Sequence, residues 1–333
     1  MKTFGWLLKR EYWEHRGGFL WAQVWTAGIV LLLIASAVIV GEVLQDKMHA
    51  TVTVGVSLSA LSTSLSQEQM SVVSTALDTS LLSLSLFPQI VLFFVTFFYL
   101  LGALYDDRKD RSVLFWKSLP ISDIGTVASK LFTAAITAPL MAFAITILMQ
   151  LAFLLILSVF MLLHNVNPMT LIWHAASPLT VWTKMLVLLP ISALWALPSY
   201  GWLLLCSSFA RSRPIAWAIL PLMLLGWAIT FSGLLQNFAL PSSWYLRNVF
   251  MRLLLSIVPA SWLWSESGFD KSAIGQVIDG TSAVSGSHET LVLQWNWIFS
   301  ALSRPDMWIG VAAGVAMLAA AVYFRRRRIE SLN

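Results

Sequence analysis

The residues of this chain best suited to chemistry with another molecule form a short charged island at residues 105–123, between two long apolar runs. Acidic and basic side chains are mixed over residues 106–111, and four consecutive large apolar residues follow at 113–116. Mixed charges contribute more to the specificity of docking than to its affinity, whereas large apolar side chains supply most of the binding energy of an interface. The pattern therefore predicts a docking surface for a protein partner; the alternative is a solvated loop whose charge serves only membrane topology. The docking candidates are Asp107, Arg108, Arg111, Leu114, Phe115, Trp116, Lys117, Leu119 and Pro120.

Motifs for catalysis or metal binding are absent from the sequence. It contains no G-x-x-x-x-G-K-[ST] loop, so we expect no P-loop ATP site in this chain. It contains no H-E-x-x-H, and His164 and His174 have no acidic residue nearby, so we interpret them as interfacial residues rather than metal ligands. We therefore expect no catalytic, cofactor-binding or metal-binding residue here, and we do not expect the chain to be an enzyme.

The composition is that of a membrane protein. Of 333 residues, 58% are hydrophobic and only 11% are charged, whereas soluble domains carry roughly 25% charged residues. The apolar runs are long enough, at about 20 residues, to cross a bilayer as helices, and they lack the alternation that a membrane barrel needs. The net charge of +5 is explained by topology and by attraction to anionic lipid, so we expect no nucleic-acid partner.

The positions of the basic residues indicate how many helices cross the membrane. The uncharged run at residues 131–183 is long enough for two spans, but a seventh span would place the basic clusters at 211–213 and 325–328 outside the cell. Because basic residues favour the cytoplasmic side, we expect an all-α protein with six transmembrane helices and both termini in the cytoplasm. The expected spans are residues 19–41, 86–105, 131–163, 185–209, 214–235 and 306–324. The expected connections are a cytoplasmic coupling loop at 106–129 and extracytoplasmic segments at 42–85, 164–184 and 236–305.

Several features refine this single transmembrane domain. Apolar residues at helical spacing near the N-terminus, with basic residues elsewhere, predict a helix that lies on the membrane surface; the alternative is a charged segment that serves only as a topology signal. These interfacial residues are Phe4, Leu7, Leu8 and Tyr12. Short apolar stretches within 236–305 predict short extracytoplasmic helices before the last span, and Gly310 and Gly314 predict close helix packing. No acid lies in the middle of an expected span, which argues against transport coupled to protons or sodium.

The sequence also predicts irregularities in the helices. The expected span 131–163 is longer than a bilayer requires, so we expect it to tilt, to kink near Pro139 or to project past the membrane. Gln150 should hydrogen-bond between helices as a packing residue, and Asp123 is the candidate cap at the start of the third helix. The residues expected to distort the fourth span are Pro190, Pro198 and Gly201.

Three segments of the charged loop carry a resemblance to a known family. They are Asp106-Asp107-Arg108-Lys109-Asp110-Arg111-Ser112, then Ser118-Leu119-Pro120-Ile121-Ser122, then Ser129-Lys130. This pattern resembles the loop after the second span of ABC-2-type ABC transporter permeases. The family usually has Gly-Thr where Arg111-Ser112 stands and Gly-Lys where Ser129-Lys130 stands. A softer similarity is the run of residues 203–213, which looks like the family's fourth span and its basic cytoplasmic turn.

The resemblance implies a permease subunit of an ATP-driven exporter in the bacterial cytoplasmic membrane. It implies a dimer with itself or with a similar permease, a separate ABC ATPase subunit that binds ATP and Mg²⁺, and contact with membrane lipid. The absence of charged residues from the spans favours an amphipathic cargo. The alternatives are a permease-like subunit with a sensing, immunity or anchoring role and no cargo, a channel, or a membrane-embedded enzyme that would need an essential polar residue such as Gln150 deep in a span.

Overall fold

The computed structural model describes residues 2–48, 67–110, 122–234, 242–262 and 295–330, and every regular element in them is a helix. The first half contains α1 (Lys2–Arg16), η1 (Gly17–Trp21), α2 (Ala22–Met48), α4 (Gln67–Ala103), α5 (Tyr105–Lys109), α7 (Asp123–Phe132), η2 (Thr133–Thr137) and α8 (Ala138–Leu163). The second half contains η3 (Met169–Trp173), α9 (Pro178–Trp195), α10 (Leu197–Phe209), α11 (Pro214–Leu234), α12 (Ser242–Tyr245), η4 (Leu246–Phe250), α13 (Met251–Leu254), α15 (Trp295–Ser303) and α16 (Pro305–Glu330). The η elements are single π-helical turns.

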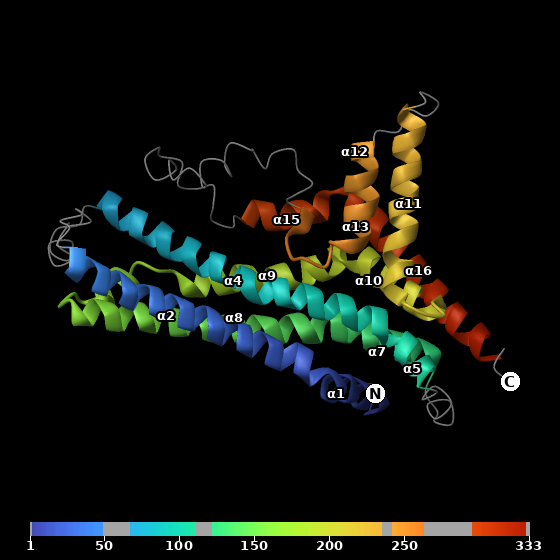
Figure 1. Ribbon diagram of the computed structural model, residues 1–333, viewed down its shortest axis with the longest axis horizontal. Coiled ribbons are helices and arrows are strands. Elements are labelled where there is room, and N and C mark those ends of the chain that lie inside the picture. Colours follow the sequence, from blue (N-terminus) through green and yellow to red (C-terminus); the bar gives the residue numbers. More distant parts are fainter. Residues whose placement is uncertain (1, 49–66, 111–121, 235–241, 263–294, 331–333) are drawn as a thin grey trace.

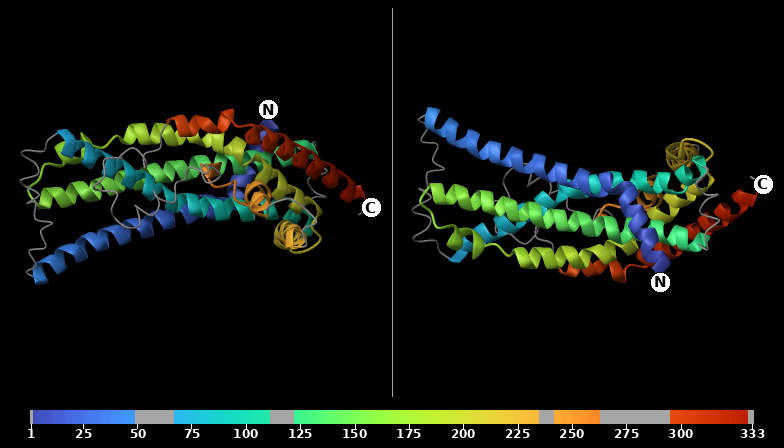
Figure 2. Two further views of the ribbon diagram at one scale, coloured as in Figure 1. Left: turned by 90° about the horizontal axis from the view of Figure 1, so that it is seen from above. Right: turned by 90° about the horizontal axis from the view of Figure 1, so that it is seen from below.

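The long helices α2, α4, α8 and α9 run along the long axis of the molecule (Figures 1 and 2). At one end, α10 packs closely along α16, while α11 stands across the long axis beside α12 (Figure 1). A Cβ atom added to Gly201 of α10 would lie 2.6 Å from the carbonyl oxygen of Gly314 in α16, so the two backbones touch only because both residues lack side chains. This confirms the predicted close packing at Gly314.

Six helical stretches in the described residues are long and apolar enough to cross a membrane. They are Phe4–Val43, Gln69–Lys109, Asp123–Leu163, Met169–Trp195, Pro214–Ser232 and Pro305–Arg327. Large apolar side chains face outward along them; Leu32 is 68% exposed, Leu163 is 72% exposed and Trp227 is 67% exposed. Such an apolar exterior is unfavourable in water and suits lipid. The predicted class, an all-helical multi-pass membrane protein, is therefore confirmed at this level.

Several helix bounds differ from those expected from the apolar runs, most clearly in the second and fourth spans. The second long helix begins at Gln67, well before residue 86, because Ser and Thr alternating with Leu and Val extend the helix rather than form a separate segment. The segment expected as the fourth span, 185–209, is broken at Ala196 into α9 and α10. The fourth stretch that is long and apolar enough to cross a membrane is Met169–Trp195, which includes much of the expected extracytoplasmic segment 164–184 and excludes α10. Pro198 lies in the first turn of α10, where its missing N–H costs no helical hydrogen bond, so the helix stops and restarts there.

The third long helix changes geometry beside a proline, as its length and Pro139 predicted. From α7 to α8 the chain is continuously helical, but residues Thr133–Thr137 form a π-helical turn just before Pro139. Further along α8, Gln150 is fully buried and holds three helices together. Its Nε2 donates to the carbonyl oxygen of Leu81 in α4 at 2.7 Å, and its Oε1 accepts from the indole of Trp182 in α9 at 2.7 Å. These bonds give Gln150 the packing role expected for it.

Candidate functional site

The two flanks of the expected coupling loop meet the first and last helices at one end of the molecule (Figure 1). The flanks are α5 and α7, and α7 packs against both α1 and α16. The start of α7 is fixed by Ser122, whose Oγ accepts a hydrogen bond from the backbone N–H of Gly125 at 3.1 Å. The sequence had suggested Asp123 as this cap, which is wrong: Asp123 is the first residue of the helix, and its carboxylate is left to bind elsewhere.

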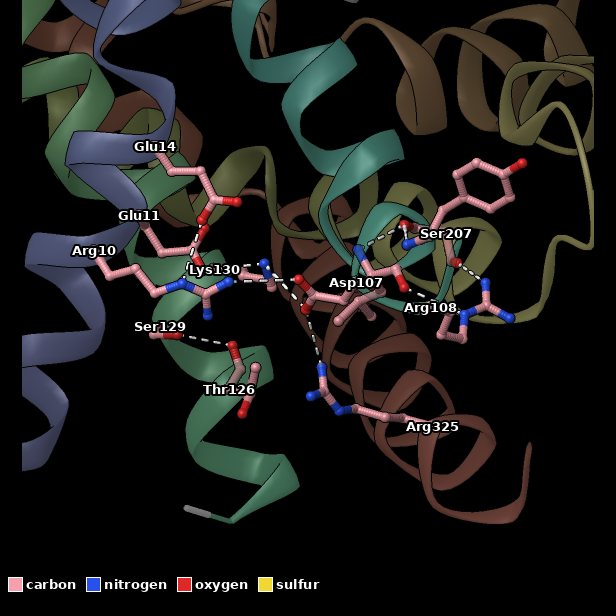
Figure 3. A network of polar contacts seen from close by, with 12 residues as sticks. Arg10, Glu11, Glu14, Asp107, Arg108, Thr126, Ser129, Lys130, Ser207 and Arg325 are labelled. Atoms are coloured by element: carbon pink, nitrogen blue, oxygen red, sulfur yellow. Dashed lines mark hydrogen bonds and ion pairs between the residues drawn. The ribbon is translucent and has the colours of Figure 1, made fainter. Parts of the chain in front are cut away.

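The centre of this end is a buried ammonium group between two buried carboxylates (Figure 3). Lys130 Nζ of α7 lies 3.0 Å from Glu11 Oε1 of α1 and 3.5 Å from Asp107 Oδ2 of α5. The side chains of Lys130 and Glu11 are 2% and 1% exposed. Water therefore does not screen these pairs, and they bind three helices that are far apart in the sequence.

Further charged groups extend the centre outward (Figure 3). Arg10 Nη2 lies 3.8 Å from Asp107 Oδ1, and Arg325 Nη1 of α16 lies 3.8 Å from Asp107 Oδ2. Arg325 also binds Asp123 Oδ1 through its Nε at 3.1 Å. We call the set Arg10, Glu11, Asp107, Asp123, Lys130 and Arg325 the charge network. It connects α1, α5, α7 and α16, so both flanks of the loop are tied to both ends of the chain.

The network is electrically balanced at its core. Its four most buried members are two acids, Glu11 and Asp107, and two bases, Lys130 and Arg325. The hydroxyl of Tyr99 donates a further hydrogen bond to Glu11 Oε2 at 2.8 Å. A buried charge is tolerated only when it is paired and hydrogen-bonded, and removing one partner costs about 3–5 kcal/mol. The network therefore holds these helices in one relative arrangement.

A second set of contacts anchors the α4–α5 junction on the end of α10. The guanidinium of Arg108 donates to the backbone carbonyl oxygens of Ser207 and Ala210, the latter at 3.1 Å. The Oγ of Ser207 accepts hydrogen bonds from the backbone N–H groups of Leu104 and Tyr105, each at 3.0 Å. Arginine at a helix C-terminus satisfies carbonyl groups that have no partner within the helix. These bonds fix where the loop leaves the bundle.

The structure places only two of the nine docking candidates. Asp107 belongs to the charge network and is 7% exposed, and Arg108 binds the end of α10, so both side chains are used within the chain. The other seven lie outside the described residues: Arg111, Leu114, Phe115, Trp116, Lys117, Leu119 and Pro120. In the described part of the island, the exposed residues are Asp106, Lys109, Asp110 and Ser122, and the hydroxyl of Ser122 already caps α7.

The predicted interfacial residues share one face of α1, but this face packs on protein. Leu7 is buried, and Phe4 makes an edge-to-face contact with Phe132 of α7, with ring centres 6.0 Å apart. Leu8 and Tyr12 are half-buried beside them. The opposite face presents Trp6 and Trp13, 67% and 55% exposed, each beneath a basic side chain. The face that is free to meet lipid is therefore the one that carries the tryptophans and basic residues.

Sequence reasoning did not find the charge network. Lys130 and Arg325 were interpreted as topological charge, Lys130 was noted besides only as part of the Ser129-Lys130 segment, and Glu11 was not singled out. One signal was present: Glu11 falls on the apolar stripe of α1, three residues after Leu8, where a lone acid needs a buried partner. The partner itself could not be named, because Lys130 comes from a distant helix.

Comparisons with known proteins returned no match among family models, curated proteins or solved structures. The fold and composition therefore define the class by themselves, a multi-pass helical membrane protein.

Proposed function

We propose that this chain is the permease subunit of an ATP-driven exporter of the ABC-2 type, and that residues 106–122 dock a separate ATPase subunit. The observation that carries the proposal is the charge network, which ties both flanks of this loop to α1 and α16 through buried ion pairs. Motion applied to the loop would reach those helices directly, because the pairs cannot separate without leaving buried charges unpaired. The resemblance of this loop to that of ABC-2-type permeases supports an ABC ATPase as the partner.

The proposal includes a topology and an assembly. The charge-network end faces the cytoplasm of a bacterial cell, where the ATPase with its ATP and Mg²⁺ is available. The chain itself supplies no hydrolysis; it pairs with a second permease subunit, and an amphipathic cargo moves between them. On this topology the outer face of α1, where Lys9 lies over the ring of Trp6 and Arg16 over that of Trp13, rests on the anionic cytoplasmic leaflet.

Co-purification tests the docking. The tagged full-length chain is extracted from its own cells in a mild detergent, and associated P-loop ATPases are identified by mass spectrometry. The triple substitution Leu114→Ser, Phe115→Ser and Trp116→Ser removes the apolar anchor. We expect the ATPase signal to fall about tenfold or more, because such residues carry most of an interface's energy.

The matched control removes apolar surface elsewhere. Leu162 and Leu163, 61% and 72% exposed, lie at the far end of α8, and their replacement by Ser should leave the ATPase signal unchanged. Both proteins must elute from size exclusion as the wild type does. An ATPase signal that survives the triple substitution in a folded protein, or no associated ATPase at all, contradicts the proposal.

A further inference from the structure

A pocket of about 380 Å³ opens where the break between α9 and α10 meets η4, α13 and the start of α16. Its walls include Trp195, Ser261, Asp306 and two arginines, Arg247 and Arg252. The pocket lies at the first turn of α16, which is the end of an apolar helix long enough to cross a membrane. Lipid headgroups lie at that depth, and exposed tryptophans such as Trp244 favour it.

The guanidinium of Arg252 is held in a fixed position in this pocket. Its central carbon lies 3.3 Å from the ring centre of Trp195, so the two planar groups are in close contact. On another side, α16 makes room for it at Gly310, where an added Cβ atom would lie 2.5 Å from Arg252 Nη2. The absence of a side chain at Gly310 is therefore what admits the guanidinium.

Both terminal nitrogens of this guanidinium are buried and have no hydrogen-bond partner within the part of the chain that the structure describes. Ser261 also lines the pocket, and its buried hydroxyl likewise has no hydrogen-bond partner in the described residues. Burial lowers the pKa of Arg252 to about 10, with Asp306 raising it and Arg304 lowering it, so the group stays charged at neutral pH. Buried donors without acceptors are costly, and a ligand that supplies oxygen atoms would remove that cost.

The remaining charges also favour an anion. The nearest described acid, Asp306, lies 3.7 Å from Arg304 Nη2 and is thus partly neutralised by another base. Arg247 adds a further positive charge to the wall. Apolar side chains stand at the same pocket, with Ile309 67% exposed and Met251 40% exposed. A polar centre with an apolar, exposed border matches a molecule that has an acidic head and an apolar tail.

We infer that this pocket binds the phosphate headgroup of an anionic amphiphile, with Arg252 donating two parallel hydrogen bonds to phosphate oxygens and Ser261 donating a third. A planar guanidinium suits this bidentate geometry better than an ammonium group does. The inference goes beyond the proposed exporter function and does not rest on it, since it concerns binding and needs no ATPase.

Native mass spectrometry of the full chain in a neutral detergent tests the inference. The probes are dioleoyl phosphatidic acid, dioleoyl phosphatidylcholine as the zwitterionic lipid, and inorganic phosphate. We expect phosphatidic acid to bind about tenfold or more tightly than either of the others, since only it combines an unshielded phosphate with a tail. Equal binding of the two lipids overturns the inference, and binding of inorganic phosphate as tight as that of phosphatidic acid overturns the amphiphile part of it.

Three variants locate the binding. Arg252→Gln should weaken phosphatidic acid binding about tenfold or more, whereas Arg211→Gln, at an exposed arginine in the turn before α11, should not change it. Gly310→Ala keeps the charge but displaces the guanidinium, so it should weaken binding as well. If Arg252→Gln does not fold, Gly310→Ala decides the question. Wild-type affinity in either folded variant overturns the assignment.

Discussion

Two charged regions of this protein are built in opposite ways. In the charge network, Lys130 and Arg325 each contact buried carboxylates within 4 Å. In the pocket, Arg252 is half-buried as a residue, but its two terminal nitrogens are buried and have no hydrogen-bond partner in the described chain. A buried ion that is paired from within the chain fixes the positions of helices, whereas one without a partner is available to a ligand. We therefore infer that arginine serves assembly near the end of α16 and recognition beside its first turns.

The two regions should lie on opposite sides of the membrane. Cys206 is the only cysteine and is buried, so Cys206→Ser provides a background without reactive thiols. In that background, Asp110→Cys reports the network end and Ser243→Cys reports the pocket end, and both positions are exposed. With a membrane-impermeant maleimide on intact cells, we expect labelling of Ser243→Cys and none of Asp110→Cys until the cells are opened. Labelling of both positions in intact cells would contradict the topology.

Removing the central ammonium should have the largest effect on stability. Lys130→Met leaves Glu11 and Asp107 facing each other without their shared cation, and should lower the free energy of unfolding by about 3–5 kcal/mol. Chemical denaturation in detergent measures the change. Lys109→Met, at an exposed lysine of α5, is the matched control and should change little. The pairing is supported if the double variant Lys130→Met/Glu11→Leu loses less free energy of unfolding than the two single variants lose together. Strictly additive losses would refute it.

Loosening the α4–α5 junction should have an intermediate effect. Ser207→Ala removes the acceptor of two backbone N–H groups, those of Leu104 and Tyr105, and should cost about 1–3 kcal/mol. Ser208 is an equally buried neighbour whose hydroxyl donates to the Leu205 carbonyl oxygen of its own helix. Ser208→Ala should therefore cost clearly less in the same denaturation experiment. Equal losses would mean that the junction is not held by Ser207.

Removing the cation of the pocket should have the smallest effect on stability. Arg252→Met loses the contact with Trp195 but also removes a buried guanidinium that lacks hydrogen-bond partners, so we expect a net change within about 1 kcal/mol. Chemical denaturation in lipid-free detergent, as for Lys130→Met, makes the comparison of the two free energies of unfolding direct. If Arg252→Met lost as much free energy of unfolding as Lys130→Met, Arg252 would be a structural group. The two regions would then not differ in the way proposed.

Some of this architecture was predictable because it depends on composition along the chain. The apolar runs predicted six helices, and Pro139 correctly marked a change in helix geometry. The start of α4 was not predicted, since a polar but helix-compatible segment gives no clear boundary in hydropathy. Pro198 correctly marked a distortion of the fourth span, although not a full break at Ala196. At the site, Asp107 and Arg108 were predicted as docking residues, but in the structure both side chains bind groups within the chain, and the sequence did not indicate those partners.

By itself the sequence determined the class of protein, because hydrophobicity is a sum over neighbouring residues and a bilayer responds to that sum. It also determined that the basic residues gather in a few segments, from which the cytoplasmic side was inferred. Only the tertiary structure decided which of these charges are paired. Lys130 meets Glu11, and Arg325 meets Asp107, across distances in sequence that no local pattern records. Charge pairing depends on the few ångströms between side chains, and only the packing of the helices sets those distances.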